Sequence, residues 1–74
     1  MPYYESAEAA VYGSLIQRGY RIDVVKLGDG LYYWHVWRHG ERINGGLSER
    51  WSDARERATQ AARQDVSHRE IPYR

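Results

Sequence analysis

The sequence predicts an α+β domain in which helices pack on one face of a three-stranded antiparallel sheet, in the order helix, strand, strand, strand, helix. Apolar residues have helical spacing in both end segments, they alternate with a period of two in the middle, and two glycine-containing turns divide that middle part. Seventy-four residues are enough for one small domain. We therefore expect a single domain over residues 1–74, with loose ends at about 1–4 and 67–74.

The N-terminal segment has helical spacing between Ser6 and Gly19. Ser6 is a candidate N-cap, Val11 and Leu15 stand four residues apart as on one helix face, and Gly19 is typical of a helix stop. Gly13 lies inside the segment and costs about 1 kcal/mol relative to Ala in a helix. A second interpretation therefore stays open, in which a shorter helix ends at Gly13 and an extended stretch follows.

From Tyr20 the period of the apolar residues changes to two. Tyr20, Ile22 and Val24 alternate with Arg21 and Asp23. This alternation is typical of a strand with one buried and one exposed face.

Two turns define two further strands, over 31–38 and 41–47. If residues 28–30 form a three-residue loop and residues 39–40 a two-residue turn, both hairpins place their apolar residues on one inner face. A two-residue first loop would leave Val36 among polar neighbours, so we reject it. The predicted inner pairs are Ile22–Val36, Val24–Trp34, Val36–Ile43, Trp34–Gly45 and Tyr32–Leu47.

The C-terminal segment returns to helical spacing after Trp51. Ser52 is a candidate N-cap and Asp53 stands in the first turn. Small side chains let a helix approach a sheet closely, and we expect Trp51 to help fill the core there. The alanines that share one helix face are Ala54, Ala58, Ala61 and Ala62.

Several short motifs resemble those of small uncharacterised bacterial α+β domains. They are G-Y-x-I-x-V at 19–24, W-x-V at 34–36, Gly-Gly at 45–46 and an Ala-rich helix at 54–62. The element order resembles double-stranded-RNA-binding domains, and residues 20–66 resemble the arm-type DNA-binding domains of tyrosine recombinases. The second resemblance implies DNA contact through the exposed sheet face. Double-stranded-RNA binders carry a lysine cluster at the start of the last helix, whereas residues 52–56 here hold two acids and no Lys.

The predicted outer face of the sheet is the candidate binding surface. Trp, Tyr and Arg are enriched at interface hot spots, and Arg stacks on aromatic rings. We therefore predict a non-catalytic interaction module that binds a protein or a second copy of itself. The alternatives are DNA binding through the same face, with Arg on phosphates or guanine edges, and a solvated face stabilised by its own cross-strand pairs. The candidate contact residues are Arg21, Tyr33, His35, Trp37, Arg42 and Asn44, in the rows Arg21–Trp37–Arg42, Asp23–His35–Asn44 and Val25–Tyr33–Gly46.

The remaining composition excludes several function classes. Eleven basic against ten acidic residues exclude a nucleic-acid clamp that acts through net charge, and there is no Cys for a disulfide or thiolate site. Asp23 beside His35 is the one acid–base pairing, without a nucleophile or a pocket, so we expect no enzyme, no cofactor and no small-molecule substrate. His35, His39 and His68 do not make a metal site. Without a long apolar run or a signal peptide, we expect a cytoplasmic protein without a membrane partner.

Overall fold

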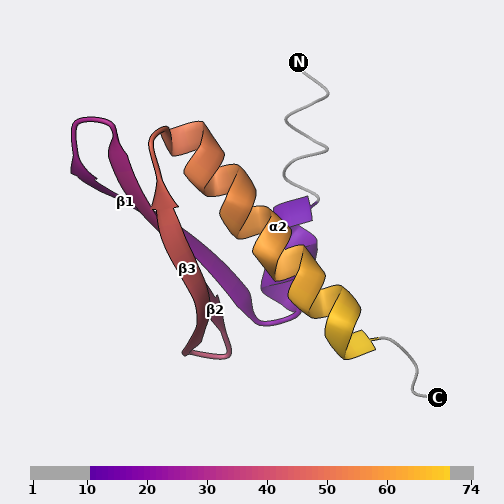
Figure 1. The fold of residues 1–74 in the computed structure, drawn as a ribbon. Coiled ribbons are helices and arrows are strands. Elements are labelled where there is room, and N and C mark those ends of the chain that lie inside the picture. The colour runs from indigo at the N-terminus through magenta and orange to yellow at the C-terminus, as the bar shows by residue number, and fades with distance from the viewer. Residues whose placement is uncertain (1–10, 71–74) are drawn as a thin grey trace.

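The predicted α+β architecture is confirmed by a computed structural model, which describes residues 11–70 (Figure 1). Helical residues 11–17 precede three antiparallel strands in the sheet order β1-β2-β3, and one long helix follows. Figure 1 shows both helical segments on the same side of the sheet. The three strands and the long helix are β1 (Tyr20–Gly28), β2 (Leu31–Arg38), β3 (Glu41–Ser48) and α2 (Trp51–Glu70).

The N-terminal helix continues through Gly13 to residue 17, so the interpretation with an extended stretch after Gly13 is wrong. The amide of Arg18 still bonds to the carbonyl of Ser14 at 3.2 Å, and Leu15 is buried in the core. Burial of an apolar face stabilises short helices more than intrinsic propensity does, which offsets the glycine. The helix stops at Gly19, as predicted, with a φ of 92°. The predicted N-cap Ser6, the predicted loose end at 1–4 and residues 71–74 of the one predicted at 67–74 lie outside the described residues.

The second predicted turn is present, whereas the predicted three-residue loop over 28–30 is wrong. Gly28 pairs with Leu31, which leaves a two-residue turn, and an irregularity just before Gly28 restores the predicted register. Gly30 has a φ of 68°, and the His39-Gly40 turn has positive φ at both central residues, 50° and 83°. This is the pattern of a type I′ turn, whose twist matches that of a hairpin. The same turn holds the helix stop: the amide of His39 donates to the carbonyl of Gly19 at 2.8 Å. A Cβ on Gly19 would lie 2.3 Å from the His39 ring, so this contact requires glycine.

The first hairpin has the predicted register, with Ile22 opposite Val36 and Val24 opposite Trp34. The second hairpin starts as predicted, with Trp37 opposite Arg42, and then shifts by one residue.

The shift is a β-bulge at Ile43, and it makes three predicted pairs wrong. In a bulge, one strand contributes two residues opposite one residue of its partner. The bulge keeps Ile43 against the core and places Gly46 under Trp34, where a Cβ would come within 2.8 Å of the indole ring. The pairs Val36–Ile43, Trp34–Gly45 and Tyr32–Leu47 are replaced by Val36–Asn44, Trp34–Gly46 and Tyr32–Ser48.

The core lies between the sheet and the helices, and the alanine stripe forms its helical side. Ala54, Ala58 and Ala62 are completely buried, and Ala61 packs at the margin. Their small side chains bring α2 close to Trp34, as predicted. Within the described residues, the buried side chains that form the core are Leu15, Tyr20, Trp34, Val36, Ala54, Ala58 and Ala62.

Trp51 does not belong to this core, contrary to the prediction. The amide of Ala54 bonds to the carbonyl of Arg50 at 3.0 Å, so α2 starts one residue before the predicted N-cap Ser52. Trp51 is therefore the first helical residue, and although it has the helical spacing of the alanine stripe it is 47% exposed. At the other end the helix continues past Ser67, where a loose end was expected, to Glu70.

Candidate interaction surface

The side of the sheet that faces away from α2, called the outer face here, is left open by the elements that the structure describes. Strand alternation and the observed pairing define it. The first predicted row is confirmed, while the bulge changes the β3 residue in the other two. The observed rows are Arg21–Trp37–Arg42, Asp23–His35–Gly45 and Val25–Tyr33–Leu47.

Asn44 does not share this face, and its predicted place opposite His35 is wrong. It pairs instead with Val36, an inner residue, and borders a shallow groove beside Ala61 of α2. Its side-chain oxygen accepts a hydrogen bond from the amide of Gly45 at 2.8 Å. Asn44 thus stabilises the bulge itself, because it satisfies a backbone donor where the ladder is interrupted.

Three aromatic side chains of β2 form a stacked row along the middle of the outer face. The ring centroids of Tyr33 and His35 are 4.5 Å apart with planes at 22°, and those of His35 and Trp37 are 6.1 Å apart at 29°. The guanidinium of Arg21 lies 5.3 Å from the centre of the Trp37 ring, so the predicted Arg–Trp stacking is confirmed on the β1 side.

Arg42 does not stack on Trp37 from the other side but runs along β3 to Tyr33. Its guanidinium lies 5.6 Å from the Tyr33 ring, and both of its terminal nitrogens donate to the phenol oxygen, at 3.3 and 3.2 Å. The bare backbone of Gly45 makes this path available, because a Cβ there would stand 3.2 Å from Arg42 Nη1. The charge of Arg42 therefore lies level with the middle row.

The acid of the middle row is paired with arginine and not with histidine. Asp23 forms an ion pair with Arg21 at 3.1 Å, and both side chains are largely exposed. Pairs of this kind contribute about 0 to 1 kcal/mol. Asp23 and His35 are neighbours across the strands, yet no hydrogen bond between them is present within residues 11–69. The predicted acid–base pairing thus lacks the bond that would orient the imidazole.

The end of the outer face near the β1–β2 turn is aliphatic, which the sequence analysis missed. Val25 is 45% exposed, Leu31 39% and Leu47 58%. Leu47 was assigned to the core because the bulge was not foreseen. The adjacent glycines 45 and 46 were the sequence feature that could have revealed this, because only one of them can lie opposite Trp34. If that residue is Gly46, Leu47 lies on the outer face.

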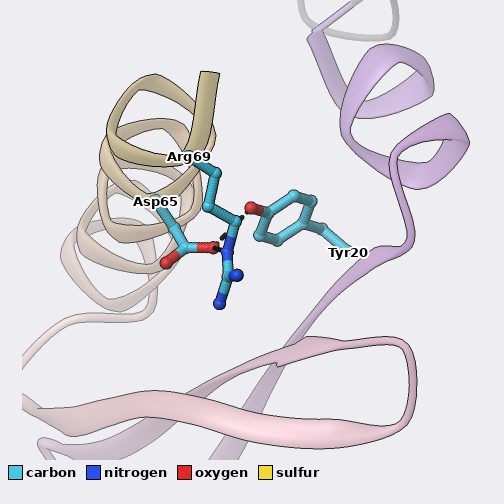
Figure 2. A network of polar contacts seen from close by, with 3 residues as sticks. All are labelled: Tyr20, Asp65 and Arg69. Atoms are coloured by element: carbon cyan, nitrogen blue, oxygen red, sulfur yellow. Dashed lines mark hydrogen bonds and ion pairs between the residues drawn. The ribbon is translucent and has the colours of Figure 1, made fainter. Parts of the chain in front are cut away.

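A polar network on the opposite side of the sheet was also missed (Figure 2). The hydroxyl of Tyr20 donates to Asp65 Oδ2 at 2.5 Å, and Arg69 Nε donates to the same oxygen at 2.6 Å. Burial alone would raise the pKa of Asp65, but these two hydrogen bonds and the charges of Arg69 and Arg38 outweigh it and leave that pKa below its usual value. Burial and the neighbouring carboxylate raise the pKa of Tyr20. The network fixes the end of α2 to the start of β1.

The described part of the chain contains neither a metal-binding group of side chains nor a helix that could span a membrane. His39 covers Gly19 and His35 lies in the aromatic row, and residues 11–69 contain no group of three or more His, Cys, Asp or Glu side chains that could hold a metal ion. Neither described helical segment is long and apolar enough to cross a membrane.

The chain matches no protein-family model, no curated protein and no solved structure. The resemblance to arm-type DNA-binding domains and to double-stranded-RNA-binding domains therefore stays a prediction about architecture, and architecture alone does not carry function.

Proposed function

We propose that this protein is a non-catalytic interaction module that binds a protein surface through the outer face of its sheet. The observation that supports the proposal is the exposed aliphatic end, Val25, Leu31 and Leu47, directly beside the aromatic row. Contiguous exposed apolar surface is uncommon on monomeric proteins and marks interaction sites, and aromatic side chains next to arginine are typical of binding hot spots.

DNA binding through the same face is the second candidate, and the stacking of Arg21 on Trp37 is the observation that favours it. Three features favour a protein contact more. The charge of Arg21 is already paired with Asp23. The apolar Leu47 lies where the sugar-phosphate backbone of DNA would contact the face, and Asn44 does not share the face at all. A face that reads DNA instead needs uncompensated cations for phosphates and polar groups for base edges.

A nuclear magnetic resonance titration separates the two candidates. Backbone, methyl and indole signals are followed while the full chain is concentrated, and then while mixed-sequence duplex DNA is added at low and moderate salt. We expect the Trp37 indole and the Leu47 methyls to shift as the protein is concentrated, without DNA and with a weaker dependence on salt than DNA binding shows. A DNA-induced shift of Arg21 and Trp37 that fades steeply with salt would replace the proposal with the second candidate.

The exposed Trp51 indole on α2 is the internal control, because it lies away from the outer face. Shifts of Trp51 equal to those of Trp37 would indicate nonspecific association and contradict the proposal.

A further inference from the structure

We infer that the partner of the outer face is a second copy of this chain, packed sheet to sheet about a two-fold axis parallel to β2. The inference rests on the proposed function and names its partner. Sheets that pack face to face keep their strand directions within about 30°, which this axis satisfies. A two-fold interface also requires that the face complement itself.

The middle row of the outer face is charge-complementary about this axis. The axis places β1 of one copy over β3 of the other and keeps each row opposite the same row. Arg21 then lies opposite position 42 of the partner, but the Arg42 guanidinium has left that row for Tyr33. Asp23 then faces Gly45 of the partner, the position over which the partner's Arg42 guanidinium lies. Within residues 11–69 Arg42 has no ion pair in its own chain, so this contact gives it a carboxylate.

The apolar side chains match about the same axis. Val25 of each copy faces Leu47 of the other, so two exposed aliphatic side chains are buried on each side of the axis. Tyr33 lies in the same row on the central strand and meets its own symmetry mate. A two-fold axis perpendicular to the strands and level with the middle row would instead set Asp23 against Asp23 and Arg42 against Arg42, and like charges in contact oppose association.

The size of the face indicates a weak dimer. Strands of eight or nine residues, spaced about 4.8 Å apart with a rise of about 3.3 Å per residue, give a face of roughly 14 by 26 Å. Such a contact lies at the small end of specific interfaces, below about 1,200 Å² in total. The test must therefore reach high protein concentration.

Sedimentation equilibrium of the full chain from about 10 µM to about 1 mM, the range in which weak interfaces associate, measures the dimer directly. Asp23→Arg replaces two attractive contacts by two repulsive ones, and we expect it to weaken the dimer at least about tenfold. Arg42→Asp removes the same two contacts but places its acid opposite Arg21 of the partner, so we expect a smaller loss. The double variant D23R/R42D restores opposite charges across the proposed axis and is expected to regain most of the lost affinity. Thermal unfolding at low concentration confirms that all three variants are folded.

Three outcomes would overturn the inference. They are a chain that stays monomeric at the highest concentration, a dimer in which Trp37 and Leu47 do not shift, and a double variant as weak as the singles. A photoreactive residue in place of Leu47, introduced in cells that produce the protein, separates this failure from failure of the proposed function. If the protein is monomeric but crosslinks to a different protein through this position, the dimer inference is wrong and the proposed function stands. If it is monomeric and crosslinks to nothing, both are wrong.

Discussion

The two faces of this sheet are built from the same three strands and carry similar residue types, yet they have opposite environments. On the inner face, Val36 and Trp34 are buried against an alanine stripe. On the outer face, Trp37 and Tyr33 of the same strand stack beside arginines, and Leu47 is exposed. The comparison shows that an aromatic or aliphatic side chain in so small a domain indicates a core only when a covering element lies above it.

Two tryptophans of β2 give the sharpest test of this difference. Trp34→Ala should destabilise the domain by about 3 to 5 kcal/mol, because it empties the centre of the core. Trp37→Ala should cost only about 1 kcal/mol, because it removes ring stacking and one arginine contact at a partly exposed site. Urea unfolding at low micromolar concentration measures both. Equal losses would mean that the outer face is as well covered as the inner one.

The bulged register predicts the next largest effect, at Gly46. Gly46→Ala forces a methyl to within 2.8 Å of the Trp34 ring, and overpacking of this kind costs about 1 to 3 kcal/mol. Gly28→Ala is the matched control, since nothing lies within 4 Å of a Cβ there and the backbone is not left-handed. If thermal unfolding shows Gly46→Ala to be as stable as Gly28→Ala, the bulge lies elsewhere in β3, and the β3 residues assigned to the inner and outer faces are wrong.

The polar network of Tyr20, Asp65 and Arg69 belongs to the inner side and predicts a pH dependence of the domain's stability. The pKa of Asp65 is lowered in the folded protein, so its stabilising contribution is present above the unfolded value of 3.8 and is lost as the pH falls through the folded value. Asp65→Asn should therefore reduce stability at neutral pH and flatten the acid side of the stability curve. Asp23→Asn is the outer-face control, and an identical flattening by that variant would contradict the assignment.

The smallest effect on stability is expected on the exposed aliphatic end. Leu47→Ser should change the free energy of unfolding by no more than about 0.5 kcal/mol, as is usual for exposed positions. The same change should lower the affinity of the outer face for its partner, measured by the concentration at which the Trp37 indole shifts. A large loss of stability in dilute solution would show that Leu47 packs inside the domain.

The sequence predicted the elements of the fold because each has a local cause. The type I′ turn needs positive φ at two successive residues, Gly19 ends the first helix, and the alanines recur at helical spacing. The register of β1 with β2 was also predicted, but from a three-residue loop, whereas the structure reaches it through a two-residue turn and an irregularity between Lys26 and Gly28. Five of the six candidate contact residues lie on the outer face, and the exception is Asn44.

The composition of the candidate surface was decided by the tertiary structure. Because of the one extra residue in β3, the outer face carries Gly45 and Leu47 where Asn44 and Gly46 were predicted. The position of the bulge depends on how Ile43 packs against the core and how closely the Trp34 ring covers Gly46, contacts across the sheet that no spacing in the chain encodes. Trp51 shows the same limit, because it has the helical spacing of the buried alanines and is nevertheless 47% exposed. Local turn and helix chemistry thus determined the architecture by itself, whereas packing across the sheet determined which side chains are left to bind.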